Sequence, residues 1–326
     1  MYKSLINYSL GGVAMDAFYI VLLFMALLLP GFILGKAKLL QEGAMISFSN
    51  VLMYVAMPFL VFVKLLDVDF KELDWFPLLL SATLPILLSP LLAWLGKICC
   101  KNEPQKKRAQ IFCATFPNCG FLGIPLAAVM FPTQAEIILY VSVFNVVSTF
   151  LLLTLGVYIL SGERKNILAW KTLISPISIA ILLGVAISFL HVKENAPVIY
   201  TFANTLAQLC TPLSMISLGF ELSKIPFLQL WKHKEAYLVS IIKLLLSPLC
   251  AFLILLFFKC CTPLIVDGSL AFAIMLATAT STAASAPAMA KKYALDAEYT
   301  ATLTLVNTLL FTVTLPLVYL LFKAAF

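Results

Sequence analysis

Ten runs of mostly apolar residues, many of them close to twenty residues long, fill almost all of this 326-residue chain. A helix of about twenty residues crosses the ~30 Å hydrocarbon layer of a bilayer. Because lipid offers no partners to backbone N–H and C=O groups, each run is predicted to be a membrane-spanning helix. The predicted spans, numbered 1 to 10 in chain order, are residues 17–35, 45–66, 75–99, 109–131, 137–160, 173–190, 199–222, 236–258, 269–289 and 300–322.

Composition excludes several other classes of protein. Hydrophobic residues make up 62% of the chain and charged residues 11%, too few charges to cover a water-soluble domain. Span 1 has no small-residue cleavage pattern after it, so it is expected to be a retained helix and not a signal peptide. The eight cysteines include the adjacent pairs 99–100 and 260–261, which are poorly placed to chelate one metal ion. Neither a metal site nor a cofactor is predicted.

The basic residues are distributed unevenly between the two sets of loops. Fifteen Lys and Arg residues belong to the loops after spans 1, 3, 5, 7 and 9, six belong to the opposite side, and Lys243 lies inside span 8. Cytoplasmic loops are enriched in Lys and Arg. We therefore predict a multi-pass protein of the plasma (cytoplasmic or inner) membrane with both termini outside. The net charge of +7 is explained by these loops, and no nucleic-acid partner is expected.

The two halves of the chain carry the same polar and proline residues at matched places. The matches are Asn50 with Asn204, Pro58 with Pro212, Leu-Leu-Ser-Pro-Leu at 87–91 with the same run at 245–249, and Asn145 with Asn307. The offset grows only from 154 to 162 positions, as small loop insertions would produce. Since five spans is an odd number, the second half must enter the membrane from the opposite side. The sequence predicts two inverted five-helix repeats, residues 1–166 and 167–326, an arrangement typical of secondary transporters.

Span 4 contains two prolines and two glycines within residues 116–125, too many for an uninterrupted helix. Non-helical backbone at this depth is tolerated where it faces protein or a wet cavity. We predict two half-helices, the second beginning near Pro125 with its free N–H groups able to attract an anion. The candidate substrate-binding residues here are Asn118, Cys119, Gly120, Gly123 and Pro125, with Pro117 and Pro125 as helix-breaking positions.

Span 9 is the predicted partner of span 4. Its run 278–287 is rich in small hydroxyl residues, which could line a polar cavity or simply allow close helix packing. We favour a site formed by the two broken spans together. The candidates in span 9 are Thr280, Ser281, Thr282 and Ser285, with Pro287 as a breaking position; Pro58 and Pro212 are further candidate breaks or hinges.

Three polar residues inside other spans are also candidates. Lys243 could face the cavity and attract an anion, or it could extend to the membrane surface. Asn145 and Asn307 could line the cavity or bond across helices. The interiors of spans 4, 5, 9 and 10 contain no Asp or Glu, whereas a cation or proton exchanger normally binds its ion with an intramembrane carboxylate. An anionic solute is therefore favoured.

At these residues the chain resembles the auxin efflux carrier family, which includes plant auxin exporters and bacterial permeases often labelled malate or malonate carriers. Residues 118–126 are similar to the family's Asn-x-Gly-x-x-Gly-x-Pro-Leu stretch. The run 281–285, continuing to 289–291, resembles Pro-Thr-Ala-x-Ser…Met-Ala-Lys of bacterial members, and 307–310 with 314–316 is a third match. One departure is that Ser281 stands where the family usually has a proline; here proline follows at Pro287, so the second break is expected at one of these two positions.

The resemblance implies a fold like that of bile-acid symporters and sodium–proton antiporters, in which spans 4 and 9 cross at their breaks. It implies a transport unit of spans 3–5 and 8–10 that moves like an elevator against a scaffold of spans 1, 2, 6 and 7, often in a homodimer. The implied substrate is a small organic anion such as a mono- or dicarboxylate. Proton and sodium stay open as coupling ions.

The function predicted from the sequence is therefore secondary transport of an organic anion across the bilayer, and not catalysis. The rival functions are an ion channel and a non-transporting membrane sensor on the same fold. An intramembrane enzyme is disfavoured because no metalloprotease motif and no paired intramembrane Asp occur, and both His191 and His233 lie in predicted loops.

Overall fold

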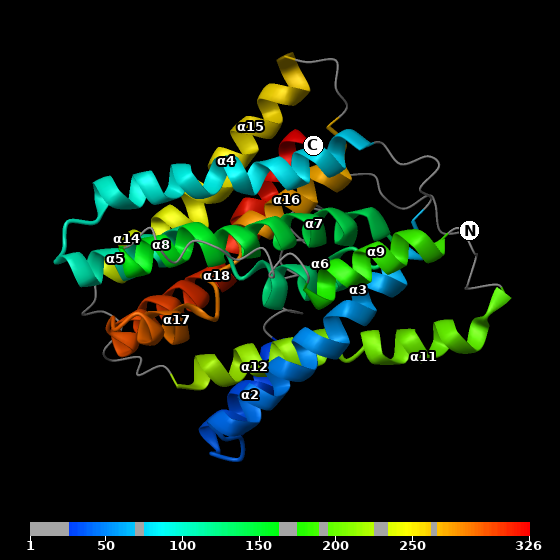
Figure 1. Ribbon diagram of the computed structural model, residues 1–326, viewed down its shortest axis with the longest axis horizontal. Coiled ribbons are helices and arrows are strands. Elements are labelled where there is room, and N and C mark those ends of the chain that lie inside the picture. Colours follow the sequence, from blue (N-terminus) through cyan, green and yellow to red (C-terminus); the bar gives the residue numbers. More distant parts are fainter. Residues whose placement is uncertain (1–25, 69–74, 163–174, 189–194, 225–233, 262–265) are drawn as a thin grey trace.

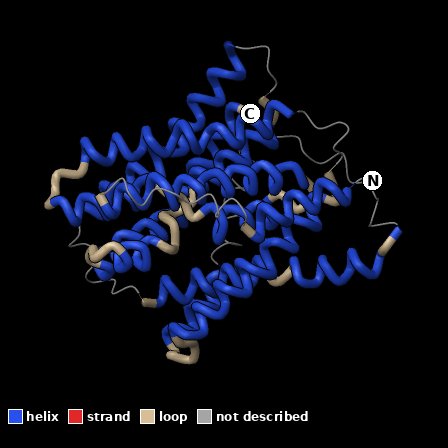
Figure 2. Tube along the Cα trace, in the orientation of Figure 1, coloured by secondary structure: helices blue, strands red, loops and turns tan. Residues whose placement is uncertain are grey.

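The computed structural model describes residues 26–68, 75–162, 175–188, 195–224, 234–261 and 266–326. This part of the chain is almost entirely helical, and its helices are joined by short loops (Figure 2). In chain order the elements, with π-helical turns labelled η, are α2 (Glu42–Val51), η1 (Leu52–Ala56), α3 (Met57–Leu65), α4 (Trp75–Cys99), α5 (Pro104–Thr115), η2 (Cys119–Gly123), α6 (Ile124–Met130), α7 (Ala135–Leu151), η3 (Leu152–Gly156), α8 (Val157–Ser161), α9 (Pro176–Ser188), α11 (Pro197–Ala207), α12 (Cys210–Ser223), α14 (Lys234–Ile241), η6 (Ile242–Leu246), α15 (Ser247–Cys261), α16 (Gly268–Ala279), α17 (Ala286–Lys292) and α18 (Ala297–Ala325). The all-helical prediction is confirmed for these residues.

Five continuous helices are long and apolar enough to cross a membrane, and they coincide with predicted spans 2, 3, 5, 8 and 10. They are Gly43–Leu65, Trp75–Cys99, Ala135–Ser161, Lys234–Cys261 and Ala297–Ala325. Shorter apolar helices occupy spans 1, 4, 6 and 9: Ala26–Lys36, Cys119–Met130, Pro176–Ser188 and Gly268–Ala279. Parts of spans 1 and 6, and both predicted loop histidines, lie outside the described residues. The prediction of a membrane-spanning protein is therefore confirmed.

Three prolines of these helices follow π-helical turns, whereas Pro85, Pro90 and Pro316 lie inside continuous α-helices. The turns η1, η2 and η6 each end two residues before a proline, at Pro58, Pro125 and Pro248 respectively. A proline cannot donate to the carbonyl four residues earlier and its ring clashes with that group, and a wider turn relieves the clash. Pro58, expected as a break, therefore lies inside the continuous helix Gly43–Leu65. In span 7 the chain leaves the helix between α11 and α12, and Pro212 falls in the first turn of α12.

One end of the molecule gathers the helix ends that adjoin the basic loops. In Figure 1, α5, α8, α14 and α17 all lie toward the left. The side chain of Asn102, between α4 and α5, donates to the Glu235 carboxylate in α14 at 3.5 Å. Arg108 of α5 donates to the Ser161 carbonyl at the end of α8 at 3.4 Å. The helix ends that adjoin the loops after spans 3, 5 and 7 are thus neighbours, in agreement with the charge pattern.

The opposite end of the molecule carries the helix ends that have few basic residues. Lys64 in the last turn of α3 donates to the Pro132 carbonyl at 2.7 Å, between α6 and α7. Lys259 in the last turn of α15 donates to the Ala325 carbonyl at 2.6 Å, at the end of α18. Each lysine thus lies beside the C-terminal end of a helix, where a positive charge interacts favourably with the helix dipole.

Close packing of glycines joins helices that come from different halves of the chain. A Cβ on Gly31, in helix Ala26–Lys36, would overlap the Ile216 carbonyl in α12, and a Cβ on Gly219 would overlap the Leu28 carbonyl. In α9, a Cβ on Gly184 would lie 2.8 Å from the Leu65 Cβ of α3. Span 1 therefore packs on span 7, and span 6 packs on span 2, through contacts of small residues that permit close approach.

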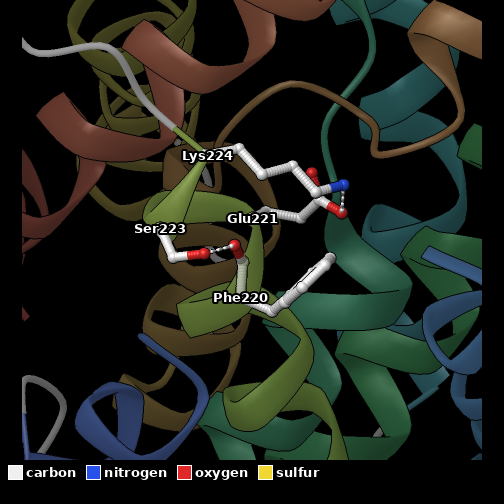
Figure 3. Close-up of polar contacts among 4 residues, drawn as sticks. All are labelled: Phe220, Glu221, Ser223 and Lys224. Atoms are coloured by element: carbon white, nitrogen blue, oxygen red, sulfur yellow. Dashed lines mark hydrogen bonds and ion pairs between the residues drawn. The ribbon is translucent and has the colours of Figure 1, made fainter. Parts of the chain in front are cut away.

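The close contact between helix Ala26–Lys36 and α12 extends to the C-terminal end of α12, next to a predicted basic loop. Figure 3 shows the Ser223 hydroxyl donating to the Phe220 carbonyl at 2.7 Å and Lys224 paired with Glu221 at 3.0 Å. The Lys224 ammonium also lies 4.6 Å from the centre of the Phe220 ring. A Cβ on Gly35 would overlap the Ser223 hydroxyl, so helix Ala26–Lys36 and α12 stay in close contact to their ends.

Candidate functional site

Two non-helical segments, one from span 4 and one from span 9, meet in the interior. The backbone N–H of Asn118 donates to the Ser281 carbonyl at 2.7 Å, and the N–H of Ala283 donates to the Phe116 carbonyl at 3.0 Å. These bonds place Pro117 opposite Thr282 in a short antiparallel pairing. We call residues 116–118 and 281–283 the crossing. Each segment satisfies backbone groups that the other leaves open, which is what irregular backbone inside a membrane requires.

Three helix ends adjoin the crossing. Helix α5 ends at Thr115, α16 ends at Ala279, and Cys119 begins the helical segment Cys119–Met130. The second half-helix of span 4 therefore begins before Pro125, which was expected near its start, because η2 adds a wide turn in front of that proline. Of the two positions left open in span 9, Ser281 lies in the non-helical segment, whereas Pro287 lies in the first turn of α17.

Asn307 fixes the span 9 side of the crossing. Its side-chain oxygen accepts the backbone N–H of Thr282 at 2.9 Å, and its side-chain nitrogen donates to the Ser240 hydroxyl at 3.2 Å. The neighbouring Thr308 hydroxyl lies 3.2 Å from the Ser281 hydroxyl. Asn307 is fully buried, so both of its polar groups are engaged within the protein. In this conformation Asn307 fixes the backbone of Thr282. Of the two roles that the sequence left open, lining the cavity and bonding across helices, the structure has the second.

Asn145, the sequence match of Asn307, lies against the span 4 side of the crossing. A Cβ on Gly120 would lie 3.2 Å from the Asn145 side-chain oxygen, so the amide packs directly on the glycine backbone. The pairs Asn145–Gly120 and Asn307–Thr282 are related by one offset of 162 positions. The side chains of Asn145 and Asn118 make no hydrogen bond among the described residues, although each is only 8% exposed. Two unpaired amides thus lie beside the first turn of the second half-helix of span 4.

Lys243 lies on the other side of the crossing, in η6. It is fully buried, so of the two orientations left open by the sequence the structure has the interior one. Its ammonium donates to the Thr278 carbonyl at 3.0 Å, and the Ser247 hydroxyl donates to the same carbonyl at 3.4 Å. Thr278 belongs to the last turn of α16, whose carbonyls have no partner within the helix. A cation at this end of a helix is stabilised by the helix dipole.

Most remaining candidates use their polar groups within the protein. Thr282 donates its hydroxyl to the Cys113 carbonyl at 2.8 Å, and Thr280 donates to the Ala277 carbonyl at 3.2 Å. The Cys119 thiol donates weakly to the Val141 carbonyl at 3.7 Å. Ser285 is exposed and lies apart from the crossing, at the start of α17. Thr280 and Thr282 therefore shape the crossing through their hydrogen bonds.

A cavity beside the crossing contains residues that the sequence reasoning missed. Its empty volume is about 220 Å³, part of which opens to the surroundings, and its enclosed part has room for about one water molecule. The walls include Pro117, Lys243 and Thr278, together with Ser89 of α4 and Ser148 of α7. Ser89 belongs to the first Leu-Leu-Ser-Pro-Leu run, whose second copy contains the cavity residue Ser247. That repeated serine was the sequence signal for this cavity.

Comparison with known proteins places this chain in a family. Residues 16–319 match the family described as "Membrane transport protein". The chain belongs to this membrane transport family. It is 29% identical over 242 residues to an uncharacterized transporter of Methanocaldococcus jannaschii, covering 72% of this chain and 77% of the relative. It is 30% identical over 240 residues to an uncharacterized transporter of Methanothermobacter thermautotrophicus, covering 71% and 76%.

The family assignment bears out the expected resemblance at the level of membrane transport. The match extends through spans 1 to 10 almost to the end of the chain, so both broken spans lie within the family region. Both archaeal relatives are described only as uncharacterized transporters. The chain is a membrane transport protein with several apolar membrane-spanning helices.

Proposed function

We propose that this protein is a secondary carrier that moves a small organic anion, such as a mono- or dicarboxylate, across the inner membrane. The observation that carries the proposal is the crossing, where two interrupted spans pair through backbone hydrogen bonds in the interior of the protein. In secondary transporters the substrate binds near the membrane midplane at such interrupted helices. Membership of a membrane transport family supports the same function.

The groups around the crossing favour a negatively charged substrate. The first N–H groups of Cys119–Met130 have no partner within the helix, and their dipoles attract an anion. Asn118 and Asn145 add unpaired amide groups, which can donate to carboxylate oxygens. Lys243 supplies a positive charge nearby, and the cavity-lining spans 3, 4, 5, 8 and 9 contain no Asp or Glu that would repel an anion.

The transport cycle follows from the two proposed inverted repeats, residues 1–166 and 167–326. The glycine contacts support this division: Gly31 and Gly184 are 153 positions apart, and their contact partners Ile216 and Leu65 are 151 apart. Spans 1, 2, 6 and 7 would form a scaffold, the second unit of a homodimer packing on it, while spans 3–5 and 8–10 move as an elevator. The basic loops would face the cytoplasm and both termini the outside.

Transport by reconstituted vesicles tests the proposal. The purified protein is placed in lipid vesicles, and uptake of labelled monocarboxylates, dicarboxylates and indole acids is measured under proton, sodium and no ion gradient. We expect saturable uptake of at least one organic anion. Asn118→Ala should lower its apparent affinity about tenfold or more, since a hydrogen bond to a charged group contributes about 1.5–3 kcal/mol.

Asn50→Ala is the matched control, because Asn50 is exposed on α2. Each variant is checked for an unchanged thermal midpoint. Undiminished transport by well-folded Asn118→Ala protein would remove Asn118 from the site. A single-channel conductance far above carrier turnover would show that the protein is a channel and not a carrier. The absence of any flux would favour the non-transporting sensor.

A further inference from the structure

Lys243 is a buried cation that has no charged partner among the residues that the structure describes. The spans that surround it contain no Asp or Glu, and its printed hydrogen bond goes to the neutral Thr278 carbonyl at 3.0 Å. A helix C-terminus carries only about half an elementary negative charge. Burying an ammonium group is unfavourable unless its charge is balanced by a partner. One end of α16 therefore compensates Lys243 only in part, and the ammonium has two further N–H groups to donate.

Two hydroxyl groups that line the same cavity as Lys243 also have no hydrogen-bond partner in the described part of the chain. Ser89 is 3% exposed and Ser148 is 4% exposed, and neither hydroxyl makes a hydrogen bond among the described residues. Serines inside helices usually donate to the carbonyl four residues earlier, as Ser142 does to Ile138 at 2.6 Å in the same helix as Ser148. Both unpaired serines line the cavity that holds Lys243. Both hydroxyl groups can therefore donate a hydrogen bond to a ligand bound in the cavity.

We propose that this cavity binds one monovalent anionic group, held by the Lys243 ammonium and by the hydroxyls of Ser89 and Ser148. Among the residues that line it, Lys243 is the one charged side chain, so one negative charge is balanced. A second negative charge would be buried without a partner, which disfavours a dicarboxylate bound entirely inside. The size of the cavity suits a halide ion, or a single carboxylate that enters from the open side.

Asn118 and Asn145, which adjoin the start of the second half-helix of span 4, are not among the residues that line the pocket. Pro117 belongs to the crossing and also lines the pocket, so an anion there would contact the crossing from the Lys243 side. The pocket itself does not depend on the proposed function. Only the idea that the anion is the carboxylate of the transported substrate rests on it.

Anion-dependent stability tests the pocket directly. The purified protein in detergent is titrated with chloride, acetate or malonate against gluconate, a bulky anion, at constant ionic strength. A ligand that binds the folded protein raises the unfolding midpoint by mass action. We expect a saturable rise with chloride or acetate and a weaker effect of malonate. Ser89→Ala and Ser148→Ala should each weaken binding about tenfold, and Lys243→Met should abolish it.

Matched controls come from residues outside the pocket. Ser142→Ala removes a buried serine from the helix of Ser148, and Lys64→Met removes a lysine from the end of α3; both should keep the wild-type anion response. If Lys243→Met fails to fold, the two serine variants still decide. An equal midpoint in all anions, or an unchanged response in both serine variants, would overturn the pocket and leave a water-filled cavity.

The source of the anion is separated by transport. A response to chloride as well as acetate, with uptake unaffected by Ser89→Ala, indicates a free inorganic anion. A response to acetate alone, with uptake of a monocarboxylate reduced by Ser89→Ala, indicates the substrate carboxylate. Organic-anion uptake without any anion-dependent midpoint refutes the pocket and retains the carrier. An anion-dependent midpoint without uptake retains the pocket and refutes the carrier.

Discussion

Replacing Asn307 by leucine should destabilise the protein, because it removes the two hydrogen bonds that the Asn307 amide makes to Thr282 and Ser240. Leucine has the same number and branching of side-chain heavy atoms as asparagine, so the substitution keeps the branched shape while it removes the polar groups. The backbone N–H of Thr282 then loses its acceptor, the Asn307 side-chain oxygen at 2.9 Å, and Thr282 is fully buried. A buried donor without a partner costs about 1–3 kcal/mol. The Ser240 hydroxyl still donates to the Ala236 carbonyl, so the main loss is at Thr282.

Thermal unfolding of the purified protein in detergent, followed by circular dichroism, measures this effect. A loss of about 2 kcal/mol corresponds to a midpoint lower by about 4–8 °C, using the response of domains of 150–250 residues. Asn145→Leu is the matched control, because the Asn145 amide makes no hydrogen bond among the described residues. It should leave the midpoint within about 2 °C of the wild type and reduce transport instead. Equal midpoints for the two variants would refute the assignment of different roles to the two asparagines.

Two further predictions concern packing and orientation. Gly219→Ala should lower the free energy of unfolding by about 1–3 kcal/mol, because its Cβ would overlap the Leu28 carbonyl. Gly268→Ala should have little effect, because its Cβ would meet nothing nearer than 3.9 Å. Equal thermal midpoints for the two variants would contradict the close helix contact. A variant that keeps only Cys261, which is exposed at the end of α15, should react in intact cells with a membrane-impermeant maleimide. Labelling of Cys261 only after the membrane is opened would reverse the proposed orientation.

The sequence predicted those features that depend on local composition. Apolar runs predicted helices in spans 2, 3, 5, 8 and 10, because a lipid-facing backbone has few alternatives to helix. The prolines and glycines at 117–125 pointed to interrupted helix in span 4, where the structure has non-helical backbone at 116–118. The local pattern did not fix where the second half-helix begins, since a π turn can accommodate Pro125 as it does Pro58. Proline in these helices thus occurs in a continuous α-helix, after a wide turn or near a break, and tertiary contacts decide among the three.

The side-chain roles at the site depended on tertiary contacts that no single span reveals. Lys243 could have reached the membrane surface, but its ammonium lies against the end of α16, a helix distant in sequence. Ser89 and Ser148 resemble ordinary packing residues of apolar helices, and only the cavity between their helices distinguishes them. Ser285 matches the motif of span 9 but lies beyond the break, where it is exposed. Spacing within a span predicted which region of the chain forms the site better than it predicted which side chains belong to the site.

The two sequence repeats are alike in residue type and differ in the partners available to them. The Asn307 amide is hydrogen-bonded to Thr282 and Ser240. In the first half, Ala82 is the position that matches Ser240 by the offset of the repeated Leu-Leu-Ser-Pro-Leu run, and its side chain has no polar group. Asn145 is therefore left with an unpaired amide at the equivalent place. Because Ala82 stands where the second half has Ser240, the side-chain N–H groups of Asn145 have no such acceptor and are free to donate. An anion at the crossing should therefore contact spans 4 and 5, while Asn307 keeps span 9 in place.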